Sequence, residues 1–287
     1  MNRIDLHCHT TLSDGLLSPP ELVTEAAELQ LSTIAITDHD TVEGITEGLE
    51  AGARLGVEVL PGVEINTDVP RGEVHILGYW FGDGWQDTQL EALLHRLATG
   101  RVARAQEMVR KLGELGAPIS FERVQEIAIG EIIGRMHVAM ALVEAGHVAT
   151  PREAFDRYIE RNGPAYAARF KLSPEDACRA IARTGGLPAL AHPFSDIIDG
   201  EVPSQTLEQR VESLRDAGLK GLEVYYPGHT AVMMDLLLEL TRRFALVPVG
   251  GSDYHGPLPG KAHLGSVQVP QRVLRRLKAV AAEPGGH

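Results

Sequence analysis

The sequence predicts an α/β fold in which βα units surround a parallel sheet and an all-helical segment interrupts them. Short apolar runs alternate with amphipathic helical stretches, which is the pattern of βα units. Between about residues 86 and 170 the strand pattern disappears and one helical stretch follows another. The 287 residues, 44% of them hydrophobic and 23% charged, suffice for one large globular domain with an insertion.

Seven short apolar runs are predicted to form strands, a number close to that of a closed barrel. They cover residues 3–9, 32–39, 57–65, 73–80, 187–193, 221–226 and 246–255.

The helices have recognisable starts. Ser18 before Pro19, and Ser173 before Pro174, place an N-cap residue ahead of a proline at the first helical position. Helices are predicted at 19–30, 42–55, 173–184, 205–217 and 229–243, and in the strand-free part at 88–115, 120–129, 134–145 and 151–160. We therefore expect a barrel domain made of residues 1–98 and 171–287, with a helical insertion domain at 99–170.

Composition excludes several classes of protein. A net charge of −12 argues against binding of duplex DNA, which relies on clustered Lys and Arg, but it leaves room for an anionic ligand held by bound cations. Two cysteines, Cys8 and Cys178, cannot form a disulfide framework. No run approaches the ~20 apolar residues of a membrane helix, and no signal peptide is recognisable. We expect a cytoplasmic protein without membrane contacts, whose oligomeric state the sequence leaves open.

Histidines and carboxylates gather at the expected strand ends. Along a strand, residues two apart project to the same face, so His7 and His9 point one way and Cys8 points away from them. Near the carboxyl ends of later strands stand His39, Glu64, His192, Asp253 and His255, while Asp14 follows the first strand and His75 lies nearer a strand start. The carboxyl ends of barrel strands are where active sites are built.

These groups together indicate a metal centre. A single histidine at a strand end is more often structural, but burying so many imidazoles and carboxylates without a cation would cost roughly 1–3 kcal/mol for each unpaired group. Imidazole and carboxylate without thiolate suit Zn, Mn or Fe. The nine groups exceed what one ion can use, so two or three divalent ions are expected.

Six motifs in order resemble the PHP (polymerase and histidinol phosphatase) family of metal-dependent phosphoesterases. They are "DLHCHTTLSDG" (5–15), "TDHDTVEG" (37–44), "PGVEI" (61–65), "VHILGY" (74–79), "AHP" (191–193) and "GGSDYHG" (250–256). The resemblance implies a distorted, TIM-barrel-like (β/α)7 barrel and a centre of three ions. The first ion would be held by His7, His9, Glu64 and Asp253, the second by Glu64, His75 and His192, and the third by Asp14, His39 and His255. Some relatives have histidine at the position of Asp14.

The helical insertion and the stretch "IIGRMHVAMAL" (132–142) are most similar to one subgroup of the family. Its members remove the 3′-phosphate from 3′,5′-bisphosphorylated nucleotides and trim RNA from the 5′ end. The resemblance implies that Arg135 and His137 hold phosphate, which suits a planar guanidinium and a residue near a helix start. Tyr166 would stack on a base, and Arg169 or Lys171 would add charge.

The expected reaction is hydrolysis of a phosphomonoester on a small phosphorylated substrate, with cations that lower the pKa of water and neutralise phosphoryl oxygens. Either Asp253 or His229 would carry the proton to the departing oxygen, and His229 would otherwise contact phosphate.

Three alternatives stay open at this point. One is another phosphatase of the family, such as one acting on histidinol phosphate. A second is a non-catalytic metal-binding PHP module of the kind attached to DNA polymerase, although no polymerase domain fits in 287 residues. The third is phosphodiesterase action on the 5′ end of short RNA. Activity with added Mn that a chelator abolishes would separate an enzyme from a module.

Overall fold

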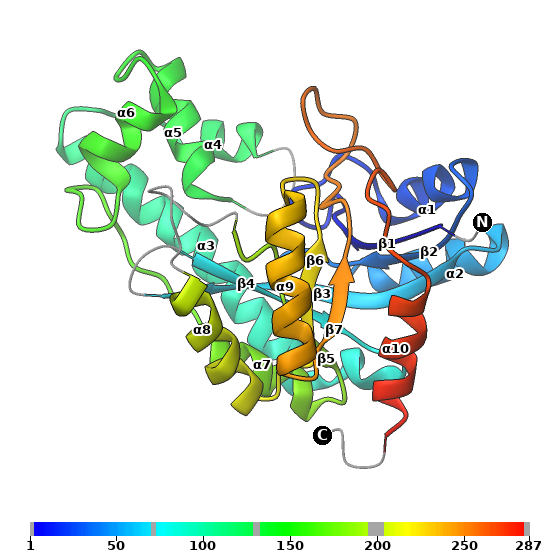
Figure 1. Cartoon of the computed structure of the whole chain (residues 1–287). Coiled ribbons are helices and arrows are strands. Elements are labelled where there is room, and N and C mark those ends of the chain that lie inside the picture. Colours follow the sequence, from blue (N-terminus) through cyan, green and yellow to red (C-terminus); the bar gives the residue numbers. More distant parts are fainter. Residues whose placement is uncertain (1–2, 70–72, 129–132, 195–203, 284–287) are drawn as a thin grey trace.

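The computed structural model describes residues 3–69, 73–128, 133–194 and 204–283. A curled sheet of seven strands lies at its centre, with the strands in chain order across the sheet (Figure 1). The strands are β1 (Arg3–Cys8), β2 (Leu31–Ile36), β3 (Glu58–Asp68), β4 (Glu73–Tyr79), β5 (Leu187–Leu190), β6 (Gly221–Tyr225) and β7 (Val247–Gly250). All seven predicted strands are present, and several end earlier than predicted, so that their polar residues lie just beyond the strand.

The prediction of a parallel sheet is wrong for β4. This strand pairs antiparallel with both β3 and β5, whereas the other neighbouring pairs are parallel. The reason is the short connection from β3 to β4, since a parallel pair needs a crossover of about a dozen residues or more. The sheet is therefore mixed.

The two edges of the curled sheet approach each other after β7. A bridge joins Cys8 at the end of β1 to Tyr254, and the backbone N–H of His9 donates to the carbonyl of Tyr254 at 2.8 Å. This contact brings the residues that follow the last strand beside the histidines that follow the first.

Helices cover the outside of the sheet (Figure 1). They are α1 (Pro19–Glu28), α2 (Ile45–Leu55), α7 (Pro174–Arg183), α8 (Ser204–Asp216), α9 (Ala231–Arg243) and α10 (Arg272–Ala281). The predicted start of α7 is confirmed, since Ser173 Oγ accepts from the N–H of Asp176 at 3.1 Å. Helix α10 was missed, although Val273, Leu274 and Leu277 give it a buried face. Cys8 packs in the apolar cluster under α1, away from His7 and His9 as predicted.

A second group of helices extends to one side of the sheet (Figure 1). It comprises α3 (Thr88–Glu114), α4 (Phe121–Ile127), α5 (Arg135–Glu144) and α6 (Pro151–Ala154), which runs into a π-helical turn at Phe155–Ile159. The predicted helix 120–129 and the stretch 132–142 each have one end outside the described residues. In this part of the chain, as elsewhere in the described residues, no helix is long and apolar enough to cross a membrane.

The two ends of helix α3 pack in two different apolar cores. Leu90 and Leu97 near its start pack in the core beneath the sheet, whereas Met108 and Leu112 near its end pack with α4 and α5. The expected domain boundary near residue 99 lies within this continuous helix. The division of the chain into two domains stays a prediction.

Candidate metal centre

The two histidines of the first strand face two carboxylates. His7 Nε2 lies 3.3 Å from both Glu64 Oε2 and Asp253 Oδ1, and His9 Nε2 lies 3.3 and 3.2 Å from the same two oxygens. Two ligands bound to one ion at about 2.1 Å lie about 3 to 3.5 Å apart. The spacing of these four side chains therefore suits a single shared cation, and they are the ligand set that the family resemblance implies for the first ion.

Glu64 also faces a second group of histidines with its other oxygen. Oε1 lies 2.9 Å from His75 Nδ1 and 3.0 Å from His192 Nε2. His75 stands near the start of its strand, yet β4 runs antiparallel, so the start of this strand lies at the same edge as the ends of its neighbours. The antiparallel direction of β4 explains the one residue that did not fit the strand-end pattern.

In the third predicted group of ligands, the ligand atoms lie farther apart. His255 Nε2 lies 3.3 Å from Asp14 Oδ1, and His39 Nε2 lies 3.7 Å from Asp14 Oδ2. The other ring nitrogen of His39, Nδ1, lies 3.2 Å from Glu64 Oε2, so this imidazole stands between two groups. His9 similarly contributes to the clusters of Asp14 and of Asp253. All nine predicted ligands thus come together, with His39 and His9 shared more widely than the sequence assigned them.

Unsatisfied ring nitrogens show that the cluster fits a cation. Within the described residues His7 Nε2, His9 Nε2, His39 Nδ1 and His192 Nδ1 are buried without a hydrogen-bond partner. The first three lie 3.2 to 3.3 Å from carboxylate oxygens without forming a hydrogen bond to them. Buried unpaired polar atoms cost about 1–3 kcal/mol each, and a shared cation would satisfy them. Nitrogen and oxygen donors together suit Zn, Mn or Fe.

Glu223 of β6 orients two of the histidines, although it was not among the site residues predicted from the sequence. Its Oε1 lies 3.0 Å from His7 Nδ1, and its Oε2 accepts from the backbone N–H of His192 at 2.6 Å. Metal-binding histidines usually donate their second ring nitrogen to a carboxylate, which fixes the orientation of the ring. The signal was a fully buried acidic residue in the apolar strand "GLEVY".

Charges in the cluster shift its pKa values strongly. Burial opposes ionisation of Glu64, but His39 and His7 outweigh burial and hold its pKa well below the usual range. Burial likewise opposes protonation of His9, yet Asp253 and Glu64 raise its pKa from 6.5 to about 10. In the same way Glu64 raises the pKa of His192 to about 9. Without a cation His9 and His192 hold protons against the carboxylates, whereas burial lowers the pKa of His39 to about 4. A binding metal must therefore displace the protons of His9 and His192.

The segment after β7 needs its glycine to reach the site. A Cβ on Gly251 would stand 2.3 Å from the backbone nitrogen of His7, so only glycine allows this close approach to β1.

Asp253 has a left-handed backbone with φ of 53°, and Tyr226 Oη donates to its Oδ2 at 3.1 Å. Asp5 shares the face of His7 but accepts from the N–H of Ser252 at 2.8 Å, so it anchors this segment and does not face the cluster.

The residues predicted to hold phosphate begin helix α5. His137 Nδ1 accepts from the backbone N–H of Gly134 at 3.1 Å, so in the neutral ring Nε2 carries the proton and can donate to an anion. Burial lowers the pKa of His137, and Asp14 and Arg101 act on it electrostatically, which places it near the third group of ligands. Arg135 lies 3.6 Å from Glu73 and 3.8 Å from Glu160.

The connection back to the sheet adds further cations. The side chain of Arg169 is 1% exposed, and its guanidinium donates to Asn66 Oδ1 at 3.3 Å. Lys171 pairs with Glu73. Tyr166 is half-buried, and its carbonyl accepts from Lys111 Nζ at 2.6 Å. Stacking of Tyr166 on a base stays a prediction.

His229 lies just beyond β6. Its Nδ1 donates to the carbonyl of Val224 at 2.9 Å, and its buried Nε2 has no partner within the described residues. Burial lowers its pKa, and in the neutral ring this Nε2 is a hydrogen-bond acceptor.

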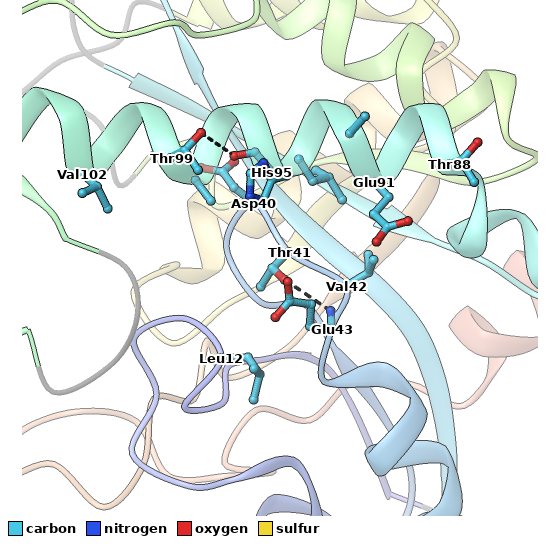
Figure 2. A pocket seen from close by; sticks show the side chains of 13 residues that line it. Leu12, Asp40, Thr41, Val42, Glu43, Thr88, Glu91, His95, Thr99 and Val102 are labelled. Carbon is cyan, nitrogen blue, oxygen red and sulfur yellow. Dashed lines mark hydrogen bonds between the residues drawn. The ribbon is translucent and has the colours of Figure 1, made fainter.

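A cavity of about 550 Å³ opens beside the cluster, between α3 and the loop after β2. Figure 2 shows Thr41, Val42 and Glu43 facing Glu91 and His95 of α3, with Leu12 below. Asp40, which follows the predicted ligand His39, lines this cavity.

The fold and the clustered imidazoles and carboxylates define a metal-binding α/β protein with a curled mixed sheet. The family model of the PHP domain matches residues 5–160, and the chain belongs to this family. The resemblance predicted from the six motifs is therefore confirmed.

Relatives match nearly the whole chain. The chain is 32% identical over 289 residues to a 3′,5′-nucleoside bisphosphate phosphatase of Chromobacterium violaceum, covering 99% of each protein. It is 32% identical over 255 residues to a 5′-3′ exoribonuclease of Haemophilus influenzae, covering 89% of this chain and 90% of that one. An inferred metal-dependent phosphoesterase of Bifidobacterium adolescentis has a similar solved structure, with a TM-score of 0.80, 28% identity and coverage of 100% and 99%.

Proposed function

We propose that the protein is a metal-dependent phosphoesterase that hydrolyses phosphomonoesters, above all the 3′-phosphate of 3′,5′-bisphosphorylated nucleotides. One observation carries the proposal: the two oxygens of Glu64 face separate sets of imidazoles, the arrangement expected of a carboxylate between two cations. Membership of the PHP family supports a hydrolase of phosphoester bonds, and the names of the relatives support a nucleotide or RNA substrate.

Two or three divalent ions, of Mn, Fe or Zn, would be held by the nine predicted ligands. When bound, such ions neutralise phosphoryl oxygens and lower the pKa of water. The ligands are His7, His9, Asp14, His39, Glu64, His75, His192, Asp253 and His255. Glu223 and Tyr226 hold members of this set in place through His7 and Asp253.

His137 would bind the phosphoryl group that is hydrolysed. Its Nε2 carries the proton because Nδ1 accepts from Gly134, and its electrostatic partner Asp14 belongs to the cluster. A donor fixed before the substrate arrives stabilises charge that develops in the transition state. Arg135 of the same helix turns instead toward Glu73 and Glu160, where it would hold another part of the substrate.

His229 would supply the proton of the departing oxygen. Asp253 is the other candidate, but its low pKa keeps it ionised beside His7 and His9. The pKa of His229 is lowered in the free protein, and the negative charge of a bound phosphate would raise it. Proton uptake by His229 would then accompany substrate binding.

The helices at 99–170 would cover the substrate as a cap over the (β/α)7 barrel of residues 1–98 and 171–287. Helix α5 supports this role, since it carries both Arg135 and His137. The cavity beside Asp40 would then accept a nucleoside, for which a volume of about 550 Å³ is sufficient.

A substrate panel tests the proposal. Purified protein loaded with Mn would be assayed on a nucleoside 3′,5′-bisphosphate, the matching 3′- and 5′-monophosphates, histidinol phosphate, an aryl phosphate, a cyclic phosphate ester and a 5′-phosphorylated oligoribonucleotide. The highest kcat/KM is expected for the bisphosphate, with release of its 3′-phosphate and loss of activity in chelator. Preference for histidinol phosphate, or no turnover of any phosphate ester, would contradict the proposal.

A further inference from the structure

Asp38 is a fully buried carboxylate beside the candidate metal centre, and none of the roles assigned so far uses it. It directly precedes the predicted ligand His39. Its Oδ1 accepts from the N–H of Thr10 and from the hydroxyl of Ser13, each at 2.6 Å, and its Oδ2 accepts from the hydroxyl of Thr10 at 2.7 Å. Among the described residues, no cluster of side chains that could hold an ion includes Asp38. The carboxylate therefore holds the loop after β1 and does not itself face a cation.

The loop that Asp38 holds carries the predicted ligand Asp14. It turns tightly, because the carbonyl of Thr10 accepts from the N–H of Ser13 at 3.0 Å and from the N–H of Gly15 at 2.9 Å. The hydroxyl of Ser13, which donates to Asp38, also lies 3.3 Å from Asp14 Oδ1. Ser13 thus stands between the buried carboxylate and the ligand, and the position of Asp14 depends on how this turn is held.

Asp14 lies opposite the two histidines of the third group of ligands. Its Oδ1 lies 3.3 Å from His255 Nε2, and its Oδ2 lies 3.7 Å from His39 Nε2. The same loop contacts the segment of His255, since the N–H of Leu16 donates to the carbonyl of His255 at 2.9 Å. A functional side chain must be held within about 0.5 Å of its productive position. A shift of the loop would therefore separate Asp14 from the two imidazoles.

The other ligands have anchors that do not involve the side chain of Asp38. The N–H of Glu64 donates to the backbone carbonyl of Asp38 at 3.1 Å, and the N–H of His9 donates to the carbonyl of Tyr254 at 2.8 Å. Glu223 holds His7 from β6. These contacts remain when the side chain of Asp38 is changed, so the consequence should be confined to Asp14.

We propose that Asp38 is a positioning residue for the third cation, the one expected between Asp14, His39 and His255. By accepting from Thr10 and Ser13 it sets the position of Asp14 and thereby the affinity of this one position. The inference rests on the metal centre of the proposed function. Groups that orient metal ligands commonly change metal affinity 10- to 100-fold when they are replaced.

Metal titration tests the inference with Asp38→Asn and Ser13→Ala. Asparagine offers one accepting oxygen in place of two, and alanine removes the hydroxyl between Asp38 and Asp14. The metal-free proteins would be titrated with Mn while free Mn is measured by electron paramagnetic resonance. The wild type should bind three ions, and both variants should bind the weakest of them about 10- to 100-fold less tightly, with the other two unchanged. Asp235→Asn, at an exposed position of α9, is the control and should behave as the wild type.

The titration separates this inference from the phosphoesterase function because it needs no substrate. A wild type that binds three ions but hydrolyses no ester would contradict the proposed function and leave the role of Asp38 intact. A wild type that binds fewer than three ions, variants with unchanged affinity, or equal weakening of all three ions would overturn the inference.

Thermal unfolding in chelator distinguishes positioning from a general structural role. The Tm of Ser13→Ala should stay close to that of the wild type, because Asp38 keeps both donors of Thr10. A large fall in the Tm of Ser13→Ala, together with loss of all ions, would show a merely structural role and contradict the inference.

Anomalous diffraction from crystals of Ser13→Ala locates the affected ion. At a Mn concentration that fills all positions of the wild type, the variant should lose the peak between Asp14, His39 and His255 and keep the peaks beside Glu64. Loss of the peaks beside Glu64, or full occupancy of the third position in the variant, would overturn the inference.

Discussion

Glu223 on β6 holds the imidazole of His7 on β1, with 3.0 Å between Oε1 and Nδ1 and both side chains fully buried. This contact turns His7 Nε2 toward Glu64 and Asp253. We therefore predict that Glu223→Gln, which keeps the shape but removes the charge, lowers metal affinity about 10- to 100-fold. Metal content after dialysis against buffered Mn measures the effect. Glu212→Gln, at an exposed position of α8, is the control. Equal metal content in Glu223→Gln and wild type would show that Glu223 does not support the ligands.

The metal-free protein should lose stability as pH rises. The pKa of His9 is raised to about 10 and that of His192 to about 9, both from 6.5. A raised pKa stabilises the folded state fully below the unfolded value and ceases to do so as pH rises through the folded value. In chelator, Tm should fall between pH 6.5 and 10, whereas protein saturated with Mn should show a smaller fall. A metal-free Tm that rises over this range would contradict the account.

His137→Ala should slow hydrolysis of every phosphomonoester. The substitution removes an N–H that is fixed by the contact of Nδ1 with Gly134, and loss of one such donor costs about 100-fold or more in kcat. Steady-state kinetics on the bisphosphate and on an aryl phosphate measure the change. Met136→Ala, one residue earlier and 50% exposed, should behave as the wild type. A loss restricted to the bisphosphate would assign His137 to substrate selectivity instead.

Arg135→Ala should discriminate between substrates. Arg135 lies by Glu73 and Glu160, where we propose that it holds a part of the substrate other than the phosphate that is hydrolysed. The kcat/KM should therefore fall more for the bisphosphate than for an aryl phosphate. Arg152→Ala, at a position 76% exposed on α6, is the control. Equal losses on both substrates would remove the idea that the helices hold a second phosphate.

Much of the site could be predicted because strand alternation and strand order are local properties. His7 and His9 share a face by their spacing, and the residues that follow consecutive strands meet at one edge of a sheet. His75 was predicted as a ligand from its motif, but its position became clear only with the antiparallel direction of β4, which depends on the short connection before it.

For other residues, no pattern in the sequence predicts the role. Glu223 is one acidic residue in a buried strand, and its two partners are distant in the sequence. Arg101 looks like a solvated residue on a long helix, yet it is buried and its guanidinium donates to Asp40, which is distant in the sequence. Such contacts come from tertiary packing, which one sequence does not display.

The central claim is that Glu64 lies between cations, and anomalous diffraction from a crystal soaked in Mn tests it most directly. We predict at least two peaks within about 2.5 Å of the carboxylate oxygens of Glu64, one toward His7 and His9 and another toward His75 and His192. The absence of any peak at these side chains, in crystals that bind Mn elsewhere or not at all, would contradict the account.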